Sequence, residues 1–176
     1  MRTLSIIIYC LLTVAASLLF LLQGSRRPRF IRFYRSMAEK EWARKGFIII
    51  LAASAIGWNF ACFISYGNSP WLLPGLALSL SLLSYRLTHA VLWRLAGIRR
   101  ILLSAFCAFL LLVVLHVSLG FPPELISLYM TVALIIEAGC LYPSREAIWA
   151  FEDWQAGTRA EPGDGEICKL YFQNEE

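Results

Sequence analysis

The chain has 176 residues, of which 59% are hydrophobic and 16% are charged, and its mean hydropathy is +0.62. A typical soluble domain carries about 25% charged and 45–50% apolar residues. The composition therefore excludes an ordinary soluble domain and predicts an all-α integral membrane protein.

Five segments are apolar enough to be predicted as transmembrane helices, since a helix needs about 20 apolar residues to cross ~30 Å of hydrocarbon. The first is predicted to be an uncleaved span, because basic residues follow it rather than precede it. The third is the weakest, since few apolar residues precede Arg86, and a four-span arrangement with a re-entrant third segment is the alternative. The five segments are residues 4–22, 47–66, 71–93, 101–119 and 125–142.

The distribution of basic residues predicts the orientation. Eight of the sixteen Lys and Arg residues lie between positions 26 and 45, and four lie between 86 and 100. The positive-inside rule places both basic loops in the cytoplasm, with the amino terminus outside and the carboxyl terminus inside. We therefore expect a multi-pass protein of a bacterial inner (cytoplasmic) membrane. The two Gly- and Pro-rich connections, at 67–70 and 120–124, predict tight turns between antiparallel helices.

The basic loop at 23–45 contains apolar side chains at three- and four-residue spacing. They are Phe30, Phe33, Tyr34, Met37, Ala38 and Trp42. This spacing predicts an amphipathic helix that lies in the cytoplasmic interface with its aromatic face toward the membrane. An irregular loop whose arginines only set the topology is the alternative.

The basic side chains of that loop form the predicted binding site for anionic lipid head groups or for an acidic partner. They are Arg29, Arg32, Arg35, Lys40 and Arg44. Because the basic clusters adjoin apolar segments, lipid is expected as their ligand and nucleic acid is not.

Arg86, His89 and Glu137 are predicted to form an intramembrane polar cluster, since charged side chains in lipid need partners. With a helical rise of 1.5 Å per residue, Arg86 and Glu137 are expected at a similar depth in the membrane, which predicts an interhelical ion pair. An ion or proton path through the three residues is the alternative. The small residues Gly75, Ser79 and Ala90 would let another helix approach this segment.

Two further features of the apolar segments predict helix contacts. Asn59 and His116 both fall in the outer half of their spans, where a hydrogen bond between them would satisfy both. Ala53, Gly57 and Ala61 recur every four residues, which marks a close helix contact, either internal or between copies.

Residues 143–176 are predicted to be an acidic cytoplasmic tail, separate from the transmembrane domain of residues 1–142. Ser144 is predicted to cap a short helix that ends near Gly157. The segment ICKLYF at 167–172 is predicted to be a strand. Since a lone strand is unstable, it must dock on the basic loop, on the membrane or on a partner.

No spacing typical of catalytic, cofactor or metal sites occurs in the sequence, so an enzyme is not expected and no cofactor is predicted. We expect a protein that acts through helix or partner contacts, as accessory, exclusion, immunity or assembly proteins do, with a membrane protein or a second copy as partner. The alternative function is a transporter or channel component that uses Arg86, His89 and Glu137.

Overall fold

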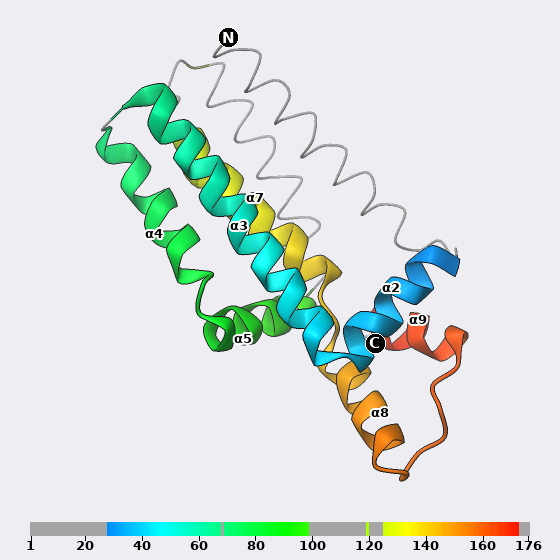
Figure 1. Ribbon diagram of the computed structural model, residues 1–176. Coiled ribbons are helices and arrows are strands. Elements are labelled where there is room, and N and C mark those ends of the chain that lie inside the picture. Colours follow the sequence, from blue (N-terminus) through cyan, green and yellow to red (C-terminus); the bar gives the residue numbers. More distant parts are fainter. Residues whose placement is uncertain (1–27, 68, 99–118, 120–124, 173–176) are drawn as a thin grey trace.

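The structure, a computed structural model, describes residues 28–67, 69–98, 119 and 125–172, and within them the chain forms helices joined by short turns. Three apolar helices, α3, α4 and α7, lie side by side and form what we call the apolar bundle (Figure 1). Helices α2, α8 and α9 gather at one end of it. The predicted spans at 4–22 and 101–119 fall outside the described residues, Leu119 excepted, so they stay predictions.

Helix α3 (Glu41–Tyr66) is long and apolar enough to cross a membrane by itself, which agrees with the span predicted at 47–66. It ends at Gly67, whose φ of 72° is a conformation that favours glycine. The chain then turns into the short 3₁₀ helix η2 (Pro70–Leu72) and into α4 (Leu73–Ser81). The predicted antiparallel hairpin is therefore confirmed (Figure 1).

The prediction of one continuous helix at 71–93 is wrong. The segment of η2 and α4 is bent by 95° from helix α5 (Tyr85–Ala96), with the break at residues 82–84. The Thr88 hydroxyl donates a hydrogen bond of 3.1 Å to the Leu82 carbonyl, which satisfies a backbone acceptor that the break leaves open. By length and composition, the bent pair qualifies as a broken span or as a re-entrant segment, and the latter is the alternative that its short apolar length had suggested.

Helix α7 (Leu125–Leu141) packs against α3, α4 and α5. Its 17 residues extend for about 25 Å. It meets the length and hydropathy requirements of a span only together with α8 (Arg145–Gln155), from which it is bent by 43°. By composition and length, the described residues thus contain one helix able to cross a membrane, and up to three if each bent pair is one span.

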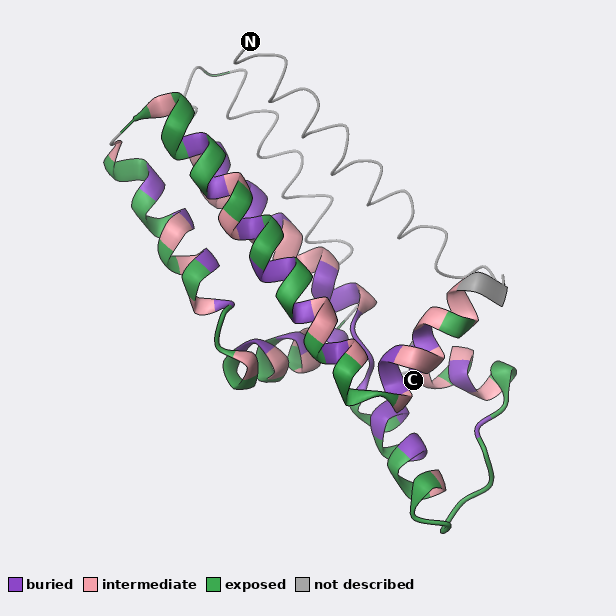
Figure 2. Ribbon diagram, in the orientation of Figure 1, coloured by how far each residue is buried: buried purple, intermediate pink, exposed green. Residues whose placement is uncertain are grey.

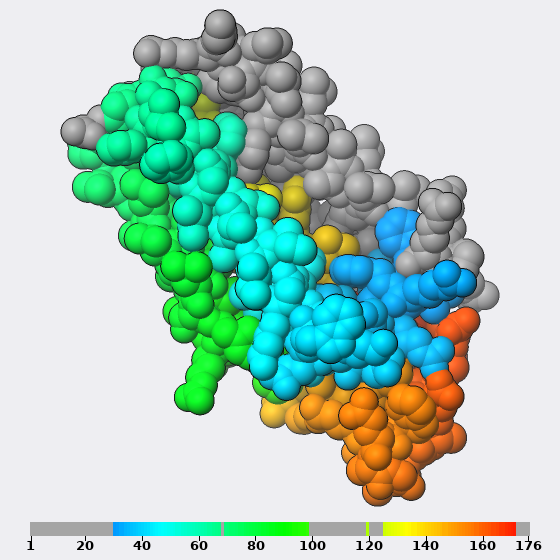
Figure 3. All heavy atoms as spheres, viewed as in Figure 1, coloured from blue at the N-terminus to red at the C-terminus, as the bar shows by residue number. Residues whose placement is uncertain are grey.

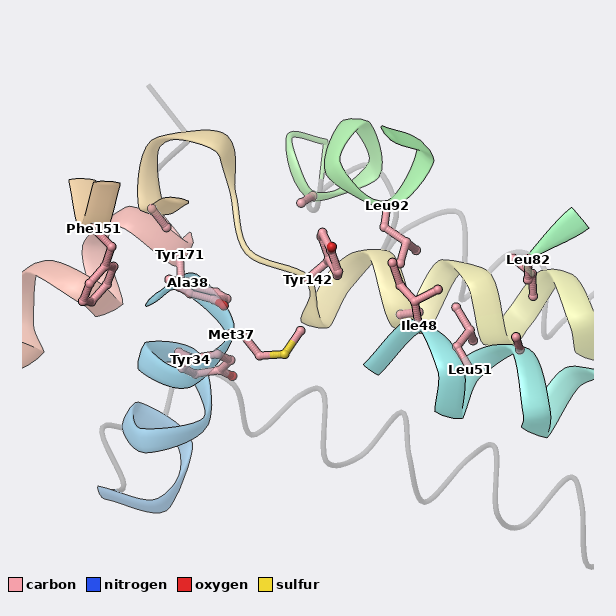
Figure 4. Packing of buried hydrophobic residues seen from close by; sticks show 14 of the residues in the cluster. Tyr34, Met37, Ala38, Ile48, Leu51, Leu82, Leu92, Tyr142, Phe151 and Tyr171 are labelled. Atoms are coloured by element: carbon pink, nitrogen blue, oxygen red, sulfur yellow. The ribbon is translucent and has the colours of Figure 1, made fainter. Parts of the chain in front are cut away.

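Helices α2 (Pro28–Glu39), α8 and α9 (Asp164–Phe172) pack together into a unit that we call the cap (Figure 3). The aromatic rings of Tyr34 and Tyr171 lie 4.5 Å apart, centroid to centroid. Figure 4 shows that the core of the cap continues through Met37 and Tyr142 into the apolar bundle. Its buried side chains are Tyr34, Met37, Ala38, Phe151, Ile167 and Tyr171.

Ser144 fastens the beginning of α8 to α9. Its side-chain oxygen accepts a hydrogen bond of 3.2 Å from the Ala147 N–H, so the predicted helix cap is confirmed. The same hydroxyl donates a hydrogen bond of 2.7 Å to the Leu170 carbonyl. Helix α8 ends two residues before Gly157, whose φ of 74° favours glycine, and this also agrees with the prediction.

Two predictions about the cap need correction. Residues 167–172 belong to helix α9 rather than to a strand. Ile167, Leu170 and Tyr171 share one face of this helix, and that face packs on α2, the helix of the basic loop.

The predicted helix in the basic loop forms only in part, as α2: it ends at Glu39, Lys40 is extended, and Trp42 is exposed on α3. The aromatic face of α2 packs against α8 and α9 rather than being left to face a membrane. The reason is that this face finds an apolar surface within the chain itself.

The cap gives the first testable prediction. Ile167→Ala removes volume from a side chain that is fully buried, so we expect the cap to lose about 2–5 kcal/mol of stability. Hydrogen exchange of the purified full chain should show faster exchange in α2 and α9 and no change in α3. Lys169→Ala, at an exposed position of the same helix, is the matched control. Equal exchange in the two variants would contradict the docking of α9 on α2.

Candidate functional site

A buried polar cluster lies where α3, α4 and α7 meet. We call it the Asn59 cluster, and its members are Asn59 on α3, Gly75 and Ser79 on α4, and Ser127 and Thr131 on α7. The four side chains other than glycine are 0% exposed, although each is polar. A polar group that loses water needs partners in the protein, so these contacts determine how the three helices fit together.

The Asn59 carboxamide joins all three helices. Its Nδ2 group lies 2.7 Å from the Ser79 Oγ and 2.8 Å from the Thr131 Oγ1, as donor to both, and 2.9 Å from the Ala55 carbonyl of its own helix. Its Oδ1 accepts a hydrogen bond from the Ser127 hydroxyl. One side chain of α3 thus contacts α4 once and α7 twice.

The remaining hydroxyl protons are used within each helix. The Ser79 hydroxyl donates to the Gly75 carbonyl at 2.8 Å, and the Thr131 hydroxyl donates to the Ser127 carbonyl at 2.9 Å. Each hydroxyl therefore has a defined direction, and the cluster is a closed hydrogen-bond network. A closed network of this kind fixes the packing of helices in an apolar environment, at about 0.6–2 kcal/mol for each interhelical bond.

Gly75 makes the network possible by its lack of a side chain. A Cβ atom at this position would lie 2.5 Å from the Asn59 Oδ1 and 2.7 Å from the Ser127 Oγ, closer than real contacts allow. Gly75 thus provides the close helix approach that the small residues of this segment predicted. The predicted partner of Asn59, His116, lies outside the described residues, whereas Ser127 was not predicted at all.

A second cluster holds α5 against the end of α7. Tyr85, His89 and Trp93 stack along α5, with ring centroids separated by 5.7 Å and 5.5 Å. The His89 Nδ1 lies 2.6 Å from the hydroxyl of Tyr142, the residue after α7. Close packing continues at Gly139, where a Cβ would lie 2.6 Å from the Leu95 Cβ. His89 is therefore part of a helix contact between α5 and α7.

Electrostatics favour neutral side chains in this second cluster. Burial lowers the pKa of His89, the positive charge of Arg44 lowers it further, and Glu41 opposes the shift. Burial likewise raises the pKa of Tyr142 above its ordinary value. The contact between the two is therefore a hydrogen bond between uncharged groups at neutral pH.

Arg44, one of the predicted lipid-binding residues, is buried instead. Its guanidinium donates hydrogen bonds to two carbonyls at the end of α2, those of Met37 at 3.1 Å and Ala38 at 2.7 Å. A cation at this end of a helix satisfies open carbonyls and complements the helix dipole. Arg44 thereby ties the first turn of α3 to the cap.

The other predicted basic residues differ in their surroundings. Arg35 forms an ion pair with Glu161 of the linker between α8 and α9, whereas Arg32 and Lys40 are exposed. The side chain of Arg29 lies outside the described ones. Only part of the predicted basic surface is thus open to a ligand.

The structure places His89, one of the three residues of the predicted polar cluster, against Tyr142. Arg86 is exposed at the start of α5, and Glu137 is half-buried on α7. The ion pair between Arg86 and Glu137 therefore stays a prediction. Among the described residues, no three His, Cys, Asp or Glu side chains lie together so that they could hold a metal ion.

Exposed positions recur along one side of α3 (Figure 2), and those named below are apolar; we call them the α3 outer face. Its large side chains are between 59% and 69% exposed, and the small residues predicted to mark a helix contact lie exposed among them. The face comprises Ile49, Ile50, Ala53, Gly57, Phe60, Ala61 and Ile64.

In comparisons with protein-family models, curated proteins and solved structures, nothing matches this chain.

The Asn59 cluster gives the second prediction. Asn59→Ala and Ser127→Ala should each lower the free energy of unfolding by about 1–3 kcal/mol, because each leaves buried polar groups without partners. The double variant should lose less than the sum, since the two residues bond to each other. Unfolding in detergent micelles measures these losses, with Ser54→Ala at an exposed position of α3 as control. Additive losses would contradict the coupling.

The third prediction concerns pH. Because folding lowers the pKa of His89 below 6.5, the unfolded chain binds a proton more readily than the folded one. We therefore expect stability to fall as the pH drops below about 6.5, toward the lowered pKa of the folded state. Thermal unfolding between pH 8 and pH 5 should show this loss, and His89→Gln should reduce it. An identical pH dependence in the variant would contradict the role of His89.

Proposed function

We propose that this protein is embedded in a membrane and acts through contacts with a partner membrane helix or a second copy, rather than by catalysis. The observation that supports the proposal best is the α3 outer face. It is apolar along its length, and its small residues leave space for another helix to approach closely.

Gly57 lies near the middle of the α3 outer face, at a position that the internal packing of the fold does not constrain. A Cβ atom at Gly57 would meet nothing within 4 Å, so no contact inside the chain requires glycine here. Gly75, in contrast, faces the Asn59 cluster and has no room for a Cβ. A glycine without an internal packing role, on an exposed apolar face, favours a close external contact.

The Asn59 cluster supports a contact role in a second way. Its hydrogen bonds hold α3, α4 and α7 together, so the outer face is presented on a supported scaffold and not on a single loose helix. Its polar groups are bonded to one another and fully buried. This arrangement suits a role in stabilising the bundle, on which the α3 outer face depends.

The fourth prediction tests the contact. In native membranes, a cysteine at Gly57 should form a crosslinked product with a short thiol reagent, in a chain whose own cysteines are replaced. A product of twice the 19.9 kDa chain mass identifies a second copy, and any other mass identifies a different partner. Gly57→Leu, assayed with a crosslinking cysteine at Ala61, should abolish the product without lowering the unfolding temperature.

A cysteine at Ala77, an exposed position on α4, is the matched control. It should give little product, because α4 is not the proposed contact. Equal crosslinking from both positions, or none from Gly57, would overturn the proposal.

A further inference from the structure

Helix α5 lies across the end of the apolar bundle instead of continuing α4, because the chain bends by 95° between them (Figure 1). One face of α5 packs on α7 and α3 through Thr88, Leu92 and Ala96, all of them buried. A helix that crosses the end of a membrane-capable bundle in this direction is placed to lie in the plane of the membrane surface.

A second apolar edge of α5 faces outward. Leu87, Val91 and Ile98 recur at four- and seven-residue spacing, at the helix and just beyond it, and are 52%, 40% and 45% exposed. The helix therefore has an apolar edge that the rest of the chain does not cover. Water is an unfavourable environment for such an edge, whereas the boundary between head groups and acyl chains suits it.

The charges of α5 are all basic. Arg86 and Arg94 are exposed on the same outward side of the helix, and residues 85–96 contain no Asp or Glu. Close by, the Arg145 guanidinium of α8 lies 4.8 Å from the Trp93 ring centre and 4.3 Å from that of Trp149. Tryptophan and arginine together are typical of the level of the lipid head groups.

The helix that the sequence suggested for this role, α2, has its aromatic face buried in the cap. We propose that α5 is the surface helix of this protein: it binds anionic phospholipid head groups through Arg86 and Arg94 and inserts Leu87, Val91 and Ile98 into the leaflet. The inference rests on the membrane embedding proposed above, but not on the partner contact of α3.

The charge complementarity selects the lipid. Two exposed guanidiniums without an acidic neighbour on their helix attract phosphate groups, and each contributes about 1 kcal/mol near an anionic leaflet. An adjacent apolar edge requires acyl chains, which a free phosphate does not provide. Anionic phospholipid satisfies both requirements at once.

The fifth prediction tests this site on the full chain in lipid nanodiscs. We expect Arg86→Gln with Arg94→Gln to weaken the retention of phosphatidylglycerol roughly tenfold or more, as measured by native mass spectrometry. Arg32→Gln with Lys40→Gln, which removes two exposed charges of α2, is the matched control and should change retention little. Unchanged retention in the α5 variant, or an equal loss in the α2 variant, would overturn the proposal.

A second measurement tests the insertion. A photoreactive benzoylphenylalanine at Val91 should crosslink to phospholipid, and the same residue at Gln155, exposed at the end of α8, should not. A protein adduct at Val91 in place of a lipid adduct would overturn the proposal in favour of a protein contact. Since the Gly57 crosslink depends on α3 and not on α5, its presence or absence distinguishes a failure of this inference from a failure of the proposed partner contact.

Discussion

A carboxamide inside an apolar bundle must find all its hydrogen-bond partners in the protein, and Asn59 imposes this constraint on the fold. Its donors and its acceptor are all used, by Ser79, Ser127 and Thr131. These bonds require α4 and α7 to lie close to α3, and the bare backbone of Gly75 permits that approach. These bonds also fix how far the three helices are shifted along one another, because a shift of one turn would leave buried polar groups unsatisfied.

Among the described residues, two polar side-chain contacts at one end of this bundle help to join α2 and α5 to it. The Arg44 guanidinium holds the last carbonyls of α2, and the His89 imidazole holds the Tyr142 hydroxyl. Both contacts lie where helices change direction: α2 meets α3 at the extended residue Lys40, and α7 gives way to α8 beyond Tyr142. The Arg44 guanidinium satisfies open carbonyls at a helix end, whereas His89 and Tyr142 bond through their side chains, as the residues of the Asn59 cluster do.

Two of the exposed apolar surfaces among the described residues carry the two proposals. The α3 outer face is uncharged and rich in small residues, which suits another helix. The outward edge of α5 combines apolar side chains with arginines, which suits the lipid surface. Both surfaces are exposed, so it is their different composition that distinguishes the proposed helix contact from the proposed lipid contact.

The sequence alone determined the helical class, the apolar helix at 47–66, the turn at Gly67 and the Ser144 cap, because each depends on local composition or on neighbours within one turn. It also pointed to Gly75 as a place of close approach. Only the tertiary structure decided that the face of α2 is covered, that residues 167–172 are helical, and that 71–93 bends into two helices. The reason is that these outcomes depend on which distant surface an apolar face meets, and a periodic pattern is the same whether its partner is lipid or protein.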